Sequence, residues 1–203
     1  MNKFIFALGF LLIGIQVNAQ KNTRGLYLGL SPTGGEIFYD EDNLSNKDPF
    51  SGLDLRLGYG INSTTTLFVG IGGYDAEGQE EDLLREDYSA GLFELGAKFH
   101  FGKKMKNPIF YAEAALQGAV ADYSEDVEFT LSGGGIGLGG GVLFYIGDVF
   151  AIDVGLKGSW GSINDVDLGG VSFDISDEDF GYRFSRLSVG VAWYPFRKNT
   201  VSP

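Results

Sequence analysis

The stretch Leu53-Asp54-Leu55-Arg56-Leu57-Gly58-Tyr59-Gly60-Ile61 alternates large apolar residues with charged residues and glycine. Successive side chains of a β-strand point to opposite faces, so this stretch has one bulky apolar face and one mixed face. Seven further stretches alternate in the same way, with these apolar residues: Leu26, Leu28 and Leu30; Leu67, Val69 and Ile71; Phe93, Leu95, Ala97, Phe99 and Phe101; Phe110, Ala112, Ala114 and Leu116; Ile136, Leu138, Val142, Phe144 and Ile146; Phe150, Ile152, Val154, Leu156 and Trp160; Leu187, Val189, Val191 and Trp193. The pattern predicts eight strands.

Glycine content argues against helices. The chain has 32 glycines, and they are spread through its most apolar stretches. Glycine costs about 1 kcal/mol relative to alanine in a helix interior, whereas in a strand it permits tight curvature. We therefore expect an all-β domain.

The connections between these stretches alternate between short and long. The short ones cover residues 62–65, 102–108 and 147–148; the long ones cover approximately 32–51, 75–87, 122–132 and 162–180. Of the 27 acidic residues, 22 fall in the four long connections, whereas the middle short one is basic through Lys103, Lys104 and Lys106. This rhythm predicts a single eight-stranded antiparallel up-and-down transmembrane β-barrel, with short periplasmic turns and long acidic extracellular loops.

The mixed faces indicate what fills such a barrel. They carry small residues and charges of both signs, and eight strands enclose a space just wide enough for side chains. We expect a polar plug in the lumen made of Asp54, Arg56, Glu94, Lys98, His100, Glu113, Gln117, Asp153, Lys157 and Arg186. A soluble periplasmic lipid-binding barrel, with its apolar face turned inward, is the alternative reading of the same alternation.

The N-terminal residues are typical of an export signal. Lys3 precedes an apolar run over residues 4–15, and Val17-Asn18-Ala19 then provides the small side chains that a signal peptidase reads. We expect residues 1–19 to be a cleaved signal peptide and residues 20–203 to form the barrel domain. An uncleaved anchor helix is the alternative, although the run is short for a span of about 20 residues. The chain has no cysteine, so a disulfide framework is excluded.

Candidate sites for chemistry are few. His100 is the only histidine and has no evident serine partner, so we expect no enzyme; a satisfied lumenal histidine, bonded to Glu113 or to water, is the simpler interpretation. Residues 135–140 match the letters of GxGxxG, but a strand follows them where a dinucleotide site needs a helix. These glycines are better explained as room for Tyr111, Tyr145 or Arg186.

The acidic connections are the remaining candidate surface. Asp165 and Asp167 begin like an EF-hand loop, yet the twelfth position is Ser176, so they are weak candidates for a metal site. Divalent cations that bridge the carboxylates to lipopolysaccharide phosphates are one alternative, and plain solvation of like-charged loops is the other. We expect no cofactor and no nucleic-acid partner.

The last alternating stretch carries the sharpest local motif. Residues 187–196 place Gly190 before Trp193, Tyr194 and Phe196, which resembles the C-terminal β-signal read by the barrel-assembly machinery. The chain departs from that motif at Pro195 and in continuing over residues 197–203. Over its mature length it resembles the small outer-membrane barrels of Gram-negative bacteria, the OmpA transmembrane-domain and OmpX-like class, and the glycine-rich outer-membrane barrels of Bacteroidetes.

The resemblance implies an integral outer-membrane protein, monomeric, in contact with outer-membrane lipid and lipopolysaccharide. Such proteins often serve envelope integrity, adhesion or binding, so we expect a non-catalytic structural or surface-interaction role. Some relatives act on lipid A, but they need a histidine with a serine and a carboxylate in reach. A narrow channel for small solutes is the other alternative.

Overall fold

A computed structural model describes residues 23–41, 44–78, 87–101, 107–124, 128–176 and 180–195. The proposed signal peptide, the basic turn lysines and Phe196 lie outside these ranges. The described residues form strands β1 (Gly25–Glu41), β2 (Leu44–Gly60), β3 (Thr65–Ala76), β4 (Tyr88–Phe101), β5 (Ile109–Ser124), β6 (Glu128–Ile146), β7 (Phe150–Leu168), β8 (Val171–Asp174) and β9 (Gly181–Trp193). No helix long and apolar enough to cross a membrane occurs in this part of the chain.

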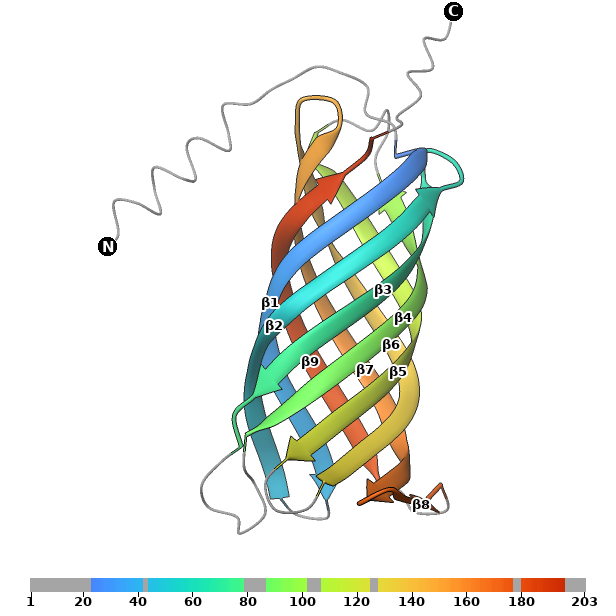
Figure 1. The fold of residues 1–203 in the computed structure, drawn as a ribbon. Coiled ribbons are helices and arrows are strands. Elements are labelled where there is room, and N and C mark those ends of the chain that lie inside the picture. Colours follow the sequence, from blue (N-terminus) through green and yellow to red (C-terminus); the bar gives the residue numbers. More distant parts are fainter. Residues whose placement is uncertain are drawn as a thin grey trace, which may run out of the picture.

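Eight of the strands close into an antiparallel barrel (Figure 1), which confirms the predicted fold. Each strand from β1 to β7 pairs with its neighbours in the chain, and β9 closes the ring between β7 and β1. The four-residue strand β8 was not predicted. It pairs with β7 alone and lies outside the ring, at the end opposite the short turns.

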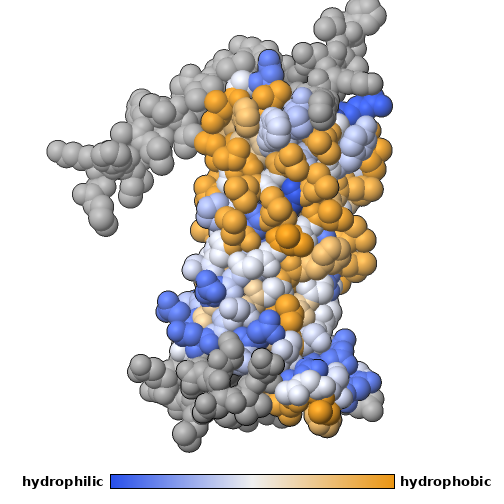
Figure 2. All heavy atoms as spheres, in the orientation of Figure 1, coloured by the Kyte–Doolittle hydropathy of each residue, from blue (hydrophilic) through white to orange (hydrophobic). Residues whose placement is uncertain are grey.

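The outward side chains form the expected apolar belt. On β2, Leu53, Leu55, Leu57 and Tyr59 are 47–58 % exposed, and Asp54 between them is buried. Figure 2 shows the belt around the half of the barrel nearest the short turns, with polar side chains over the other half. The alternative of a soluble barrel with this face inward is therefore wrong, because the large aliphatic residues point out of the barrel.

The strands run well beyond the predicted boundaries. β1 and β2 stay in register from Gly25 opposite Gly60 to Glu41 opposite Leu44, so most of the segment 32–51 is hairpin and not loop. β5, β6 and β7 likewise extend through residues predicted as connections. Beyond the belt the outward residues are no longer apolar, so the alternation that predicts a strand is lost from the sequence there. The backbone ladder nevertheless continues.

The turn after β6 also differs from its prediction as a two-residue loop. Ile146 pairs with Phe150, so the connection contains three residues, Gly147 to Val149. Gly147 has φ of 68°, a left-handed conformation that glycine adopts without steric cost. Three-residue hairpin loops commonly place such a residue in this conformation.

Candidate functional site in the barrel lumen

The interior of the barrel contains three layers. Aromatic and aliphatic side chains fill the end near the short turns, and charged side chains fill the middle. A second apolar cluster fills the half beyond the belt, which we call the extracellular half after its predicted location. The structure places all ten residues predicted for the lumen inside the barrel and brings nine of them together in the middle layer; His100 lies nearer the short turns. We call the eight charged ones the ionic layer: Asp54, Arg56, Glu94, Lys98, Glu113, Asp153, Lys157 and Arg186.

The ionic layer is balanced, because it contains four carboxylates and four cations. Glu94 lies at its centre, 2.9 Å from the Lys157 ammonium and 3.5 Å from the Arg56 guanidinium. It also accepts hydrogen bonds from Arg186 and, at 2.6 Å, from the Gln117 amide. A buried charge is tolerated only where partners replace its lost hydration, and Glu94 has three cationic partners.

Glu113 is the second shared carboxylate. Its oxygens lie 3.0 Å from Arg56, 3.2 Å from Lys157 and 3.8 Å from Lys98. Since Arg56 and Lys157 contact both Glu94 and Glu113, the two glutamates are held in one network and not in separate pairs. Removing any one member therefore leaves several others with altered partners.

Lys98 connects the ionic layer to the aromatic end of the barrel. Its ammonium pairs with Asp153 at 2.9 Å and lies 3.9 Å from the centroid of the Tyr111 ring. The Tyr111 hydroxyl donates to the other oxygen of Asp153 at 2.7 Å. Cation–π contacts gain strength when the cation is desolvated, as Lys98 is here.

Asp54 connects the ionic layer to the extracellular half. It accepts hydrogen bonds from the hydroxyls of Thr33, at 3.0 Å, and Tyr74. Arg186 lies 3.7 Å from the same carboxylate and donates to the Tyr74 hydroxyl at 2.7 Å. Tyr74 thus has its hydroxyl in the polar network and its ring in the apolar cluster beyond it.

The layer near the short turns contains three tyrosine rings packed at tilted angles. The Tyr194 ring lies 5.4 Å from the Tyr27 ring and 5.5 Å from the Tyr145 ring, between centroids, and all three are buried. Of the predicted β-signal residues, Tyr194 and Gly190 face the interior, and Trp193 faces outward against Phe150 with 6.1 Å between ring centroids. Trp193 lies at the rim of the apolar belt, where outer-membrane barrels concentrate aromatic residues.

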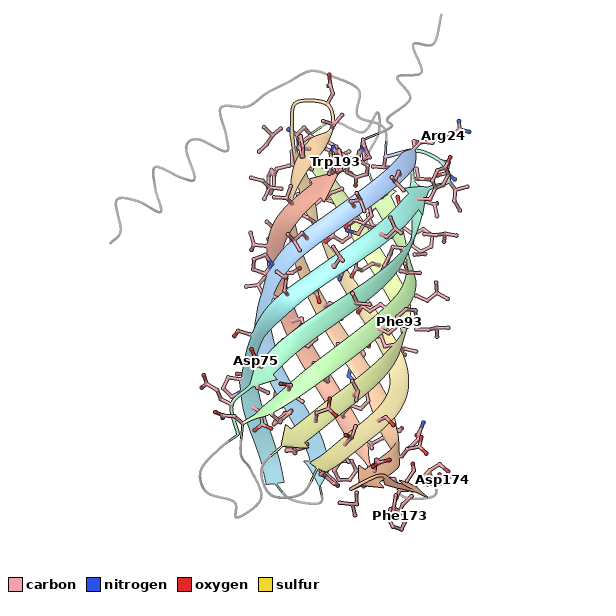
Figure 3. All side chains as sticks on the ribbon, viewed as in Figure 1. Arg24, Asp75, Phe93, Phe173, Asp174 and Trp193 are labelled. Carbon is pink, nitrogen blue, oxygen red and sulfur yellow. The ribbon has the colours of Figure 1, made fainter. Side chains whose placement is uncertain are left out.

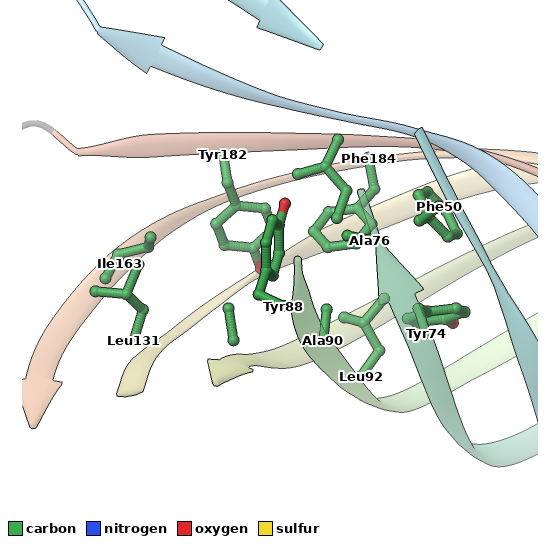
Figure 4. Close-up of a cluster of buried hydrophobic side chains, with 12 residues drawn as sticks. Phe50, Tyr74, Ala76, Tyr88, Ala90, Leu92, Leu131, Ile163, Tyr182 and Phe184 are labelled. Atoms are coloured by element: carbon green, nitrogen blue, oxygen red, sulfur yellow. The ribbon is translucent and has the colours of Figure 1, made fainter. Parts of the chain in front are cut away.

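Sequence reasoning missed the extracellular cluster. Figure 4 shows its buried side chains, contributed by all eight strands of the barrel: Ile37, Phe50, Tyr74, Ala76, Tyr88, Ala90, Leu92, Ala121, Leu131, Ile163, Tyr182 and Phe184. Many of them lie in segments taken for connections. A usable signal was present, since Tyr88, Ala90 and Leu92 alternate with period two just as the belt residues do.

The inward glycines make room for lumenal side chains. A Cβ on Gly155 would lie 2.7 Å from the Tyr111 hydroxyl, and one on Gly141 would lie equally close to the Tyr111 ring. Tyr111 reaches Asp153 across the space that these glycines leave. The chance GxGxxG match over residues 135–140 lies inside β6 and precedes no helix among the described residues. Its glycines make room for Gln117 and Lys157 and not, as predicted, for Tyr111, Tyr145 or Arg186, since a Cβ on Gly137 would lie 2.5 Å from the Gln117 amide nitrogen and 2.6 Å from the Lys157 side chain.

His100 is buried near the Tyr111 ring, with 6.3 Å between centroids. Neither of its ring nitrogens has a hydrogen-bond partner among the described residues, so the expected bond to Glu113 is not formed. The arrangement offers no base oriented toward a nucleophile. Among the described residues, the His100 ring therefore lacks the hydrogen bonds to serine and carboxylate that a serine–histidine hydrolase uses.

The weak metal candidates lie at the far end of the barrel. Residues 165–174 form part of the β7–β8 hairpin and not a calcium loop, with Asp167 accepting a hydrogen bond from the Gly170 amide at 2.9 Å. The described residues include no group of three or more acidic, histidine or cysteine side chains able to hold a metal ion. Asp165 and Asp167 alone provide too few ligands for calcium, which takes six to eight.

Three solved structures of similar fold are distant from this chain in sequence. No family model and no curated protein matches the chain. Neisserial surface protein A superposes with a TM-score of 0.57 at 16 % identity, covering 84 % of this chain and 97 % of its own. Ail, the attachment invasion locus protein of Yersinia pestis, gives 0.51 at 16 % identity, covering 84 % and 99 %. The outer membrane protein AlkL gives 0.52 at 13 % identity, covering 92 % and 96 %. The chain therefore has the fold of the small eight-stranded outer-membrane β-barrels.

Proposed function

We propose that this protein is an integral outer-membrane barrel with a closed lumen, whose role is structural or in surface interaction, without catalysis. The observation that carries the proposal is the filled interior. The cavity left within the ionic layer has a volume of about 10 Å³, room for about one water molecule. Arg56, Glu113 and Lys157 line it, and their ion pairs would have to break before a solute could pass.

The length of the strands supports a role at the cell surface. β6 and β7 have 19 residues each, whereas a strand crosses the bilayer with about 9–11 residues. At about 3.3 Å per residue, roughly eight residues of each strand extend some 26 Å along the strand beyond the membrane. A packed extension of this kind presents side chains to the outside on a rigid support. The name of Ail, a protein of similar fold, refers to attachment and invasion, which fits the same proposal.

The proposed setting implies particular partners. The apolar belt contacts outer-membrane lipid, the extension lies among lipopolysaccharide, and the barrel-assembly machinery reads the C-terminal strand during biogenesis. Asp75 and Asp122 are exposed, and such carboxylates would bridge through divalent cations to lipopolysaccharide phosphates. Calcium at millimolar concentration is then expected to raise the melting temperature and slow proteolysis of the extension.

Planar-bilayer recording tests the closed lumen. We expect no discrete conductance steps from the wild-type protein, with insertion verified by a heat-dependent change of mobility in SDS gels. The Glu113→Gln/Lys98→Met variant, which keeps the lumen neutral overall, is the matched control and is also expected to be silent. Large ohmic steps in the wild type would replace this proposal with a narrow channel.

Lipid A mass spectrometry tests the absence of catalysis. We expect the same lipid A spectrum with and without overexpression of the protein. A changed spectrum that reverts with His100→Ala would contradict the proposal and indicate a lipid A enzyme.

A further inference from the structure

The β7–β8 hairpin is the outermost part of the described extension. Leu168 pairs with Val171 across a two-residue turn, in which Gly169 and Gly170 have φ of 58° and 86°. Positive φ at both central residues is the geometry of a type I′ turn, which suits a regular two-stranded hairpin. Figure 3 labels Phe173 and Asp174 at this end, far from the short turns.

A bulge in β7 determines which way the hairpin residues face. Gly133 of β6 pairs with Ile163, but Ser132 pairs with Asp165, so Asn164 is an extra residue. An extra residue reverses the alternation beyond it. Val166, which packs against the extracellular cluster, therefore continues the lumenal face of Ile163.

The hairpin consequently has one apolar face and one acidic face. Directly paired residues share a face, so Leu168, Val171 and Phe173 lie together; they are 43 %, 57 % and 49 % exposed. The opposite face pairs Asp165 with Asp174. Figure 2 shows the apolar patch at the extracellular end, separated from the belt by polar side chains, so lipid of the spanned membrane does not explain it. A cluster of exposed apolar side chains in water is typical of an interaction site.

No described strand pairs with the outer edge of β8. Among the described residues β8 pairs with β7 only. In a two-residue hairpin the closing pair exchanges backbone hydrogen bonds and the next pair does not, so the N–H and C=O of Ser172 and Asp174 point away from β7. An edge of this kind is a template for strand addition.

We propose that β8 is the docking edge for an extended, basic segment of a partner protein, which adds to the sheet as a further strand. Its apolar residues would lie beside Val171 and Phe173, and its lysines or arginines beside Asp174, on the face that also carries Asp165 of β7. This deepens the surface-interaction role proposed above and rests on it.

The negative charge of the hairpin favours a basic partner. Like charges directly opposite each other, as Asp165 and Asp174 are, destabilise a strand pair, and a cation between them relieves the repulsion. Asp174 accepts a hydrogen bond from the Ser176 amide at 2.9 Å, and the hydrogen bonds with Ser176 lower the pKa of Asp174, so it is charged at neutral pH. A second copy of this chain, with net charge −12, would bring the same carboxylates and is disfavoured.

A labelled peptide tests the edge directly. The probe alternates valine with lysine and arginine over eight residues, and its fluorescence anisotropy is measured against the full chain in lipid nanodiscs. We expect saturable binding that weakens as salt rises, and none with glutamate in place of the basic residues. Ser172→Pro removes an edge N–H without touching the β7 ladder and is expected to weaken binding at least tenfold. Ser172→Ala, the matched control, is expected to stay within twofold.

A second variant tests the charge complementarity. Asp165→Asn/Asp174→Asn is expected to weaken binding about threefold to tenfold and to flatten its salt dependence. The docking edge would be overturned if the acidic peptide bound as tightly as the basic one, or if Ser172→Pro bound the basic peptide as tightly as the wild type. Neither result would affect the proposal that the lumen is closed. Conductance steps in the wild type with peptide binding preserved would instead overturn the closed-lumen function alone.

Discussion

The membrane half of the barrel and its extracellular half are built with opposite polarity on the same strands. On β4, Phe93 faces outward and Glu94 inward within the belt, whereas beyond it Ser89 faces outward and Tyr88 inward. The hydrophobic effect favours burial only where the outside is water. The extracellular half therefore has an ordinary apolar core, whereas the membrane half combines the ionic layer with the buried tyrosine layer near the short turns. The medium outside each half determines which residues face outward.

The largest effect is expected in the ionic layer. Glu94→Gln keeps the shape but leaves Arg56, Lys157 and Arg186 short of one negative charge. Breaking a buried ion network by removing one partner costs about 3–5 kcal/mol. The free energy of unfolding, measured with urea in lipid vesicles through tryptophan fluorescence, should fall by that amount.

The exposed pair of Glu36 and Lys47, 3.9 Å apart, provides the matched control. Glu36→Gln should change the same free energy by less than about 1 kcal/mol, because water already solvates both groups. Combining Glu94→Gln with Lys157→Met should recover part of the loss. Equal effects of the two single variants would contradict the claim that the membrane half depends on its ion pairs.

The extracellular cluster should respond as a soluble core does. Ile37 is fully buried in it, and Ile37→Ala is expected to cost about 2–5 kcal/mol through lost burial and a cavity. Protease cleavage of the extension should become faster at temperatures where the membrane half is still folded. A loss below about 0.5 kcal/mol would show that the extension is not held by its apolar interior.

Substitutions on the outward face should have the smallest effects on the free energy of unfolding, and these effects should depend on position along the strand. Leu55 and Ser51 face outward on the same strand, the first within the belt and the second beyond it. Leu55→Lys is expected to cost about 2–4 kcal/mol if it lies near the midplane, and Ser51→Lys about 0–1. Urea unfolding of both variants in the same vesicles measures the difference in free energy of unfolding. Equal losses for the two variants would contradict the assignment of the belt to the membrane.

The outward face of the membrane half could be predicted from sequence because it meets a single uniform solvent. Leu53, Leu55 and Leu57 alternate strictly, and the structure exposes all three. The inward charges followed from the same alternation. Their pairing did not, because the partners of Glu94 come from β2, β7 and β9, and nothing local in the sequence relates those strands.

The extension was harder to predict because its apolar residues face inward and not outward, and because their alternation is weaker. Once the outside is polar, strand residues such as Pro49, Ser51 and Asp75 resemble loop residues. The bulge at Asn164 then breaks the alternation on β7, so Ile163 and Val166 share a face although three positions separate them. A single-residue insertion of this kind has no compositional signature.

Ion pairs that span the lumen affect how the barrel assembles. Arg56 of β2 pairs with Glu113 of β5, and Lys98 of β4 pairs with Asp153 of β7, so neither pair joins neighbouring strands. Among the lumenal ion pairs of the described residues, Lys98–Glu113, 3.8 Å apart on β4 and β5, is the one that joins neighbouring strands. A hairpin that entered the bilayer alone would therefore carry most of its charges into hydrocarbon without their partners, at about 2.5–3.5 kcal/mol each. Insertion one hairpin at a time is therefore penalised, and neutralisation of the charges coincides with closure of the ring. Assembly should accordingly be all-or-none, with few half-inserted species.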